Sequence, residues 1–465
     1  MNDRQKIALR LGLLVLVGSL IGFGPSAISV TQKAYNVQTA LVNGNYQDGA
    51  ENLLDLAEEN PWWRSLWENA GDAAVQAGDY QLAKHAYERA QELNALSEAG
   101  QIQLGETYLL LGENESAEII WGELSSSPLA LRRLAAMYEE QVEISKAVEV
   151  WHHYLTLTAD TSTPELIYNF GLLIAADTPP KALVYLDQSA EIYPEAGEIA
   201  TAIRDSINEE PAYQFVSVGQ SLAAINHWHL AAYAFEKATR LRPDYPEGWL
   251  YWGEALQHLE NHTTEPLEAL ETGFALDEDS PLAKLFLGLY WQRAGSHLTA
   301  LEYFQLVETI WPDNSNVLIE QGKSLAALGE LEAELGKYEA AVVLDSQDGS
   351  IFSQLAQFCV TYKYQIKESG LPAARIAVQL SPQVPGSLDV LGQVLLALDD
   401  EMNAVRLFQQ ALETDPTFAP SYFHLGILYS VRDEKDLAVY YLQQVLTYSE
   451  NPALLDQAER LLASY

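Results

Sequence analysis

A short apolar motif recurs along most of the 465-residue chain, and it constrains the fold more than any other feature. Each copy has a large apolar residue, a glycine four positions later and a further apolar residue three positions after that. Four clear copies carry their glycine at Gly219, Gly253, Gly392 and Gly426. Residues with this spacing lie on one face of a helix, so each copy predicts an amphipathic helix.

A second motif follows the first one at a regular distance. Ala231, Phe235 and Ala238 form one copy, and a proline follows at Pro243. Other copies begin at Ala83, Ala117, Ala147, Ala300, Ala404 and Ala438. Small residues allow two antiparallel helices to approach closely, the aromatic residue fills the space beside them, and a proline cannot continue a helix. The two motifs together predict a chain of helix pairs.

These residues resemble the tetratricopeptide repeat, a helix-turn-helix unit of about 34 positions. The resemblance covers nearly everything after residue 30 and implies an all-α, right-handed superhelical solenoid. One pair cannot cover its own apolar face, so successive units stack into a continuous core. We expect about 12 units over residues 29–450. Residues 451–465 begin with Asn451 and Pro452 and are expected to form a helix that caps the open end.

Some units depart from the repeat pattern. The unit with Gly171 is one residue short before its second motif, and the units at Gly253 and Ala356 carry extra residues between their helices. The unit at Gly322 has Glu334 where a small alanine is expected. In these units the resemblance implies the helices but not the detailed geometry of the turns.

The chain opens with a basic stretch and then an apolar one. Arg4, Lys6 and Arg10 precede an almost wholly apolar run over residues 11–23. Extended over residues 7–28, this run approaches the roughly 20 residues that cross a hydrocarbon core. Ala27 supplies one small residue for a cleavage site, but Pro25 is a poor partner for it. We favour an uncleaved signal anchor over residues 1–28, with a cleaved signal peptide and a buried helix as alternatives.

The charges that flank this segment predict its orientation. Positive residues precede it and only Lys33 follows soon after, which favours a cytoplasmic N-terminus. A single-pass transmembrane helix would then place the repeats on the extracytoplasmic side of a membrane. A cleaved signal would instead give a secreted protein.

The overall charge is strongly negative, with 26 Lys and Arg residues against 65 Asp and Glu residues and a formal net charge of −39. Such a field repels phosphate backbones and anionic headgroups. We therefore expect no binding to nucleic acid, and a protein partner that is basic or neutral rather than acidic.

The sequence contains no phosphate-binding loop, dinucleotide fingerprint or metalloprotease motif. We nominate no catalytic residue, metal or cofactor and expect a protein that is not an enzyme. Histidines near the helix turns, together with nearby carboxylates, could hold zinc. Adjacent repeats lie about 10 Å apart, however, so we interpret these histidines as polar turn residues. They are His227, His229, His258, His262 and His297.

In the tetratricopeptide family the first helix of each pair lines a concave groove that holds extended peptides or partner helices. The resemblance implies the following candidates for a partner-binding groove: Glu68, Asp72, Glu106, Arg132, Tyr168, Gln220, Tyr251, Glu254, Gln257 and Phe423. The basic clamp that cochaperone members use to grip a C-terminal carboxylate is missing, because Arg132 and Lys323 fall in separate units.

Three functions fit these observations. The first is a membrane-tethered scaffold for protein–protein interaction. The second is an accessory solenoid in polysaccharide assembly or export, in which some of the 25 Tyr and 10 Trp residues stack on a glycan. The repeat itself uses most of these aromatic residues, which disfavours the second function. The third is an accessory or regulatory subunit of an enzyme.

Overall fold

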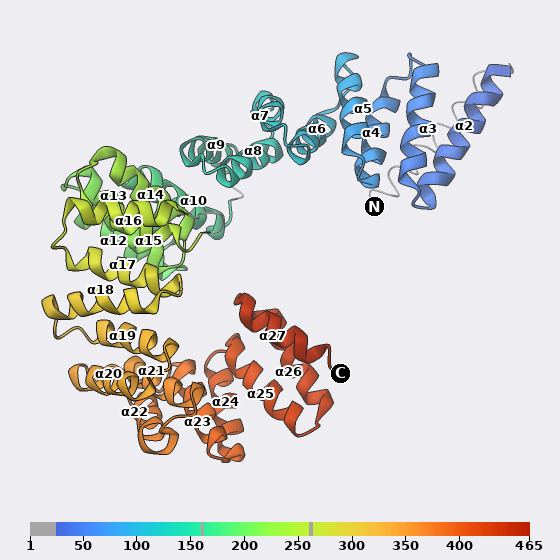
Figure 1. Ribbon diagram of the computed structural model, residues 1–465. Helices are drawn as coiled ribbons and strands as arrows, with labels where there is room; N and C mark the ends of the chain where they lie inside the picture. Colours follow the sequence, from blue (N-terminus) through green and yellow to red (C-terminus); the bar gives the residue numbers. More distant parts are fainter. Residues whose placement is uncertain (1–24, 160–161, 260–263) are drawn as a thin grey trace. The chain divides into compact units, whose positions relative to one another are not determined.

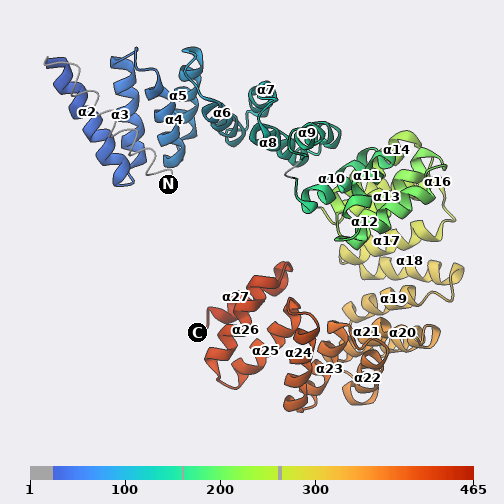
Figure 2. The same cartoon turned by 180° about the vertical axis from the view of Figure 1, so that it is seen from behind.

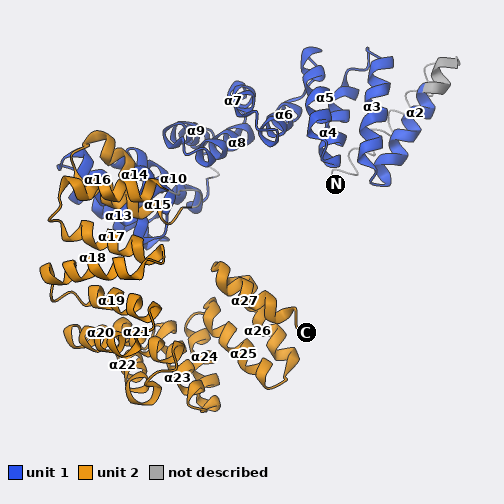
Figure 3. Ribbon diagram, in the orientation of Figure 1, with its two compact units in different colours: residues 1–234 blue, residues 235–465 orange. Residues whose placement is uncertain are grey.

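The computed structural model describes residues 25–159, 162–259 and 264–465, and it gives the side chains of the first helix from residue 30 onward. Its 26 α-helices form an all-α tetratricopeptide-type solenoid, which confirms the predicted fold class. The right-handed superhelical path stays a prediction. The chain divides into two compact units, Met1–Ala234 and Phe235–Tyr465 (Figure 3).

The first unit contains α2 to α13, and α14 (Trp228–Leu241) spans the boundary between the units. The helices of the first unit are α2 (Pro25–Val42), α3 (Tyr46–Glu59), α4 (Ser65–Ala77), α5 (Tyr80–Glu92), α6 (Glu98–Leu110), α7 (Asn114–Glu123), α8 (Pro128–Glu140), α9 (Ile144–Leu157), α10 (Pro164–Asp177), α11 (Pro179–Ser189), α12 (Pro194–Asp205) and α13 (Pro211–Ala224).

The second unit continues the array to the C-terminus (Figure 1). Its helices are α15 (Pro246–Leu256), α16 (Glu265–Leu276), α17 (Pro281–Arg293), α18 (His297–Ile310), α19 (Ser315–Ala327), α20 (Leu331–Leu344), α21 (Gly349–Thr361), α22 (Leu371–Leu380), α23 (Pro385–Ala397), α24 (Glu401–Thr414), α25 (Ala419–Val431), α26 (Lys435–Tyr448) and α27 (Pro452–Leu462).

The predicted N-terminal signal segment falls largely outside the described residues, which begin at Pro25. Among the helices that are described, none combines the length and the apolar character that a membrane crossing requires.

The two sequence motifs meet within each helix pair. A β-carbon on Gly71 of α4 would lie 2.5 Å from the Tyr87 ring of α5, and one on Gly392 of α23 would lie 2.6 Å from the Phe408 ring of α24. Both aromatic side chains are fully buried. The glycine is therefore required because the aromatic ring of the second helix lies directly on the first one. Figure 2 shows these pairs as a series of antiparallel hairpins.

The turns within the pairs also follow from the sequence. Gly78, Gly295 and Gly329 take positive φ angles at the end of a first helix, a conformation that costs glycine little. Asp79 and Asp400 then cap the second helices, each accepting a hydrogen bond from a backbone N–H three residues later. The paired helices consequently end and begin within a few residues of each other.

The irregular units deviate where the sequence indicated. Only Thr178 separates α10 from α11, and a short π-helix, η2 (Ile366–Gly370), occupies the extra residues before α22. Helix α12 was not predicted separately. It lies between α11 and α13 in the chain and contacts α10, α11 and α13, so it interrupts the regular pairing.

The α19–α20 repeat has polar residues in its core. Glu334 is only 1% exposed, and burial raises its pKa to about 8. Its Oε2 atom has no hydrogen-bond partner among the described residues. Gln321 is also 1% exposed and donates a hydrogen bond of 2.8 Å to Glu308. This repeat therefore buries a carboxyl group at the position where other repeats have alanine.

The last helix, α27, packs on α26 through Ala458 and Leu442. The side chain of Asn451 accepts hydrogen bonds from the backbone N–H groups of Ala453 and Leu454 and so caps its N-terminus. The sequence indicated this helix, and its role as a cap of the solenoid stays a prediction.

Candidate functional site

The first helices of successive pairs touch one another. In the second unit α15 contacts α17, α17 contacts α19, α21 contacts α23 and α23 contacts α25, and in the first unit α4 contacts α6. The described second helices make no contact of comparable extent with one another. The first helices are thus the more closely spaced set, which places them on the inner side of the curvature within each unit. We call their exposed surface the first-helix face.

Three predicted groove residues in the first unit are carboxylates with partners inside the protein. Glu68 accepts hydrogen bonds from the backbone N–H and the hydroxyl of Ser97, at 2.9 and 2.5 Å. Asp72 accepts a hydrogen bond of 2.8 Å from the hydroxyl of buried Tyr87. Glu106 forms an ion pair of 2.8 Å with Arg133. These carboxylates therefore hold neighbouring helices together.

Three further predicted residues lie on α8, α10 and α13. Arg132 is exposed, whereas Tyr168 is buried and stacks on Tyr193 with ring centroids 4.3 Å apart. Tyr168 thus packs within the first unit and offers little surface to a partner. Gln220 is exposed.

Gln220 belongs to a shallow depression of about 280 Å³ between α12 and α13. Two carboxylates, Glu195 and Glu198, line the depression, and Glu195 also accepts a hydrogen bond of 3.4 Å from Tyr168. Ser217 and Ser221 add hydroxyl groups. The depression is polar and has negative charge, which suits the ammonium or guanidinium group of a basic side chain.

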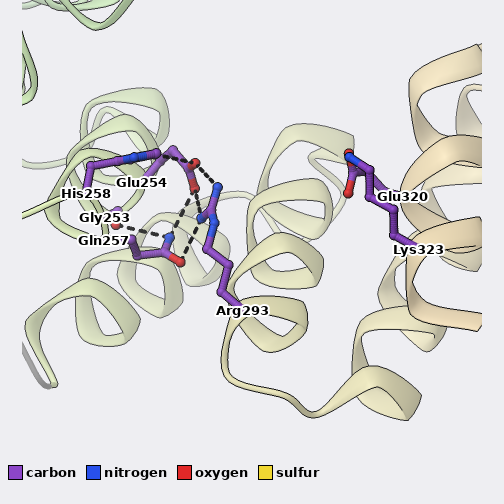
Figure 4. Close-up of polar contacts among 7 residues, drawn as sticks. All are labelled: Gly253, Glu254, Gln257, His258, Arg293, Glu320 and Lys323. Atoms are coloured by element: carbon purple, nitrogen blue, oxygen red, sulfur yellow. Dashed lines mark hydrogen bonds and ion pairs between the residues drawn. The ribbon is translucent and has the colours of Figure 1, made fainter. Parts of the chain in front are cut away.

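Glu254 forms the centre of a polar cluster in the second unit (Figure 4). Its carboxylate accepts hydrogen bonds from both terminal nitrogens of Arg293, at 2.9 and 2.5 Å, and from Gln257 at 3.0 Å. His258 lies 3.5 Å away. Burial opposes ionisation, but the hydrogen bonds from His258 and Arg293 outweigh it and lower the pKa of Glu254. The cluster joins α15 to α17 across two repeats.

Sequence reasoning identified Glu254 and Gln257 but missed Arg293. Tyr251, also predicted for the groove, stacks on Phe235 and meets Phe286 edge to face, with ring centroids 5.4 and 5.3 Å away. Its ring therefore serves the packing between repeats.

A second polar cluster spans α21, α23 and α25, and sequence reasoning missed it. Asp389 is 3% exposed and accepts hydrogen bonds from Ser421 at 2.7 Å, His424 at 3.0 Å and Gln393 at 2.8 Å. Gln393 also exchanges two hydrogen bonds of 3.2 Å with Gln357. Three successive first helices are therefore joined by side chains on one face.

A sequence signal for this cluster existed. Asp389 lies three residues before the motif glycine Gly392, and the predicted groove residue Phe423 lies three residues before Gly426. Phe423 itself is 8% exposed and packs against Leu442. The position three residues before the motif glycine thus holds a core residue, Phe423, in one repeat. In the repeat before it, the same position holds Asp389, a carboxylate that forms a hydrogen-bond network.

The sequence also singled out Lys323 and a set of histidines near the helix turns. Lys323 forms an ion pair of 2.7 Å with Glu320 of its own helix (Figure 4). Over the ranges that the structure describes, no three His, Cys, Asp or Glu side chains gather closely enough to hold a metal ion. His262 lies outside those ranges.

The fold and the first-helix face define a class of protein, the helical-repeat scaffold, whose extended surface binds other proteins. Within it, residues 68–128 and 407–440 each match the tetratricopeptide repeat family, so these two parts of the chain are tetratricopeptide repeats. Such proteins bind protein partners and are typically non-enzymatic scaffolds. No curated protein matches the chain in sequence.

Three solved structures are similar to this chain at a distance. Yeast Tom70 has 14% identity over 94% of this chain and 96% of that chain, with a TM-score of 0.45. The Cut9–Hcn1 hetero-tetramer of the APC/C has 15% identity over 94% and 98%, with a TM-score of 0.37. MamA from Desulfovibrio magneticus RS-1 has 19% identity over 36% and 94%, with a TM-score of 0.31. Similarities this distant say nothing about partners.

Proposed function

We propose that this protein is a membrane-tethered scaffold, with its repeats on the extracytoplasmic side and its first-helix face bound to a partner peptide or helix. The observation that carries the proposal is the set of polar side chains that join successive first helices. Arg293 with Glu254 and the network around Asp389 are the two clearest cases. Such links hold the first helices in register, so the face is ordered before a partner arrives, and binding costs less conformational entropy.

The charge on this face favours a neutral or basic partner. The depression beside Gln220 has Glu195 and Glu198 on its lining, and the chain as a whole carries a net charge of −39. Opposite charge speeds encounter and rejects like-charged competitors. A partner segment with a Lys or Arg side chain directed into this depression would satisfy both carboxylates.

Crosslinked affinity purification of the full-length protein from host membranes tests the proposal. Gln220→Lys adds a positive charge on α13, within the first-helix face, and Glu198→Lys reverses a charge on the adjoining helix α12, in the same depression. Val184→Lys serves as the matched control, because Val184 is 70% exposed on the second helix α11. We expect a protein partner that is recovered with the wild type and with Val184→Lys, and lost with the two changes in the depression.

Recovery of the same partner with all three variants would show that this face does not bind it. Recovery of a glycan with no protein would favour the alternative, an accessory solenoid in polysaccharide assembly or export. That alternative has less support, because aromatic motif residues such as Tyr87, Trp121 and Phe408 are buried and cannot stack on a sugar.

A further inference from the structure

Two tryptophans form a stacked pair in the turn between α3 and α4, and Trp62 is exposed whereas Trp63 is partly buried. The rings of Trp62 and Trp63 are nearly parallel, at 4°, with centroids 5.6 Å apart. Trp62 is 72% exposed, which is unusual for a residue that normally buries most of its large apolar surface. The core of the repeats does not use this ring.

The turn that carries the pair is well fixed. The backbone N–H of Trp63 donates a hydrogen bond of 2.8 Å to the carbonyl of Asn60, which is itself buried. Arg64 donates a hydrogen bond of 3.1 Å to the carbonyl of Leu93 at the end of α5. These hydrogen bonds fix the backbone of the turn and so hold the two tryptophans in place.

The pair lies at the end of the first unit that holds α2, the first described helix. Lys33 of α2 forms an ion pair of 2.6 Å with Glu59, the last residue of α3. Helices α2 and α3 thus run antiparallel (Figure 1), and the turn after α3 lies toward the start of α2. That helix begins at Pro25, directly after the apolar run over residues 11–23. From Lys33 back to Pro25 is about 12 Å of helix.

We infer that Trp62 and Trp63 dock onto the headgroup region of the lipid bilayer in which the N-terminal segment is anchored. This inference rests on the proposed membrane tether. Tryptophan is enriched at membrane interfaces, because its ring is apolar and its indole N–H is polar. The docking surface would hold the first repeats against the bilayer and set their orientation.

The charged side chains near the α3–α4 turn are compatible with contact between this turn and a lipid surface that has no net charge. Glu59 is paired with Lys33, and Glu92 at the end of α5 is paired with Arg89 at 2.5 Å. Arg64 adds one positive charge, and exposed Glu58 and Glu98 add two negative charges. The net charge of −39 repels anionic headgroups, so zwitterionic phosphatidylcholine is the appropriate lipid for a test.

The test places a nitroxide label on the full-length chain by Trp62→Cys or, as a control, by Val42→Cys. Val42 is 68% exposed at the opposite end of α2. Cys359 is buried, and labelling of the wild type measures its background. Each protein is reconstituted in phosphatidylcholine vesicles, and power saturation compares exposure of the label to oxygen with exposure to a water-soluble nickel chelate. We expect at least a threefold loss of nickel exposure at position 62 and no change at position 42.

Flotation of the vesicles separates this inference from the tether on which it rests. If the chain does not float with the vesicles, the tether fails, and the docking surface fails with it. If the chain floats but position 62 is as exposed to nickel as position 42, only the docking surface is wrong. Protection of position 62 before vesicles are added would show that protein covers the pair. If a soluble oligosaccharide without lipid protects the label at position 62 from nickel, the tryptophan pair binds a glycan and not a bilayer.

A second measurement leaves the turn free of labels. Dibrominated phosphatidylcholine quenches tryptophan fluorescence only at short range, so it reports rings in contact with lipid. Trp62→Phe with Trp63→Phe should reduce the quenched fraction, whereas Trp249→Phe in the second unit should not reduce it. Equal quenching in the wild type and the double variant would overturn the inference.

Discussion

Two repeats of the second unit, α23–α24 and α19–α20, solve the same packing problem with different residues. In α23–α24 the small residues Gly392 and Ala404 lie beside the buried ring of Phe408. In α19–α20 the equivalent glycine, Gly322, faces Tyr338, but Glu334 replaces the alanine and Gln321 adds a buried amide.

The difference shows which part of the repeat signature the fold requires. Both repeats form two helices of similar length, so the polar residues do not prevent the hairpin. A β-carbon on Gly322 would lie 3.1 Å from the Tyr338 ring, against 2.6 Å between Gly392 and Phe408. The repeat with the polar core is thus less tightly packed at its glycine. Loose packing and an unpartnered buried carboxyl oxygen both lower local stability.

The largest effect should come from filling the tight glycine position. Gly392→Ala forces its new methyl group against the Phe408 ring and should lower the free energy of unfolding by about 2 kcal/mol. Gly322→Ala has more room and gains helix propensity, so its cost should be below about 1 kcal/mol. Urea unfolding followed by circular dichroism measures both. Equal costs would contradict the difference in packing.

A change of intermediate size should appear at Glu334 and should depend on pH. Burial raises the pKa of this carboxyl from 4.5 to about 8 in the folded protein, so the folded state binds the proton more tightly than the unfolded state does. The stability of the wild type therefore falls as pH rises from 4.5 to about 8 and then levels off. Glu334→Gln cannot ionise, and it should be the more stable protein at pH 9.

The control for this prediction is the exposed acid Glu339 on the same helix, α20. Glu339→Gln keeps Glu334 and should therefore keep the fall in stability between pH 4.5 and about 8. Parallel profiles for the wild type and Glu334→Gln between pH 5 and 8 would show that Glu334 titrates normally.

The smallest effects should come from the turns of the same two repeats. Gly329 follows α19 with a φ of 81°, and Asp399 follows α23 with a φ of 64°. Gly329→Ala should lower the free energy of unfolding by about 1 kcal/mol, because alanine is strained at positive φ. Asp399→Gly should raise it by about 0.5 kcal/mol through the relief of that strain. Thermal unfolding detects both signs, and a loss of stability in Asp399→Gly would be the unexpected result.

Much of the fold could be predicted from the sequence because the glycine and the aromatic residue of each pair meet directly. The spacing that places Gly392 opposite Phe408 is a local property of two adjacent helices. Helix α12 could not be predicted in the same way, because it lies outside the pairing and its contacts depend on three neighbouring helices.

The candidate site was less accessible to sequence reasoning. The position of a residue within the repeat motif shows whether it lies on the first-helix face. It does not show whether the next repeat covers that residue. Tyr168 and Phe423 have the groove register and are nevertheless buried. Asp389 has the same register and forms a network only because Ser421 and His424 of the next first helix reach it. These contacts depend on the stacking of repeats. The role of the ten candidates as a partner groove stays a prediction.

Site-specific photocrosslinking tests the central claim, that a partner binds the first-helix face, most directly. A photoreactive amino acid replaces Gln220 on α13 or Val184 on α11, two exposed positions in the same unit. After irradiation of intact cells, the account predicts a discrete crosslinked protein from position 220 and none from position 184. A crosslink from position 184 alone, or the same crosslink from both positions, would contradict it.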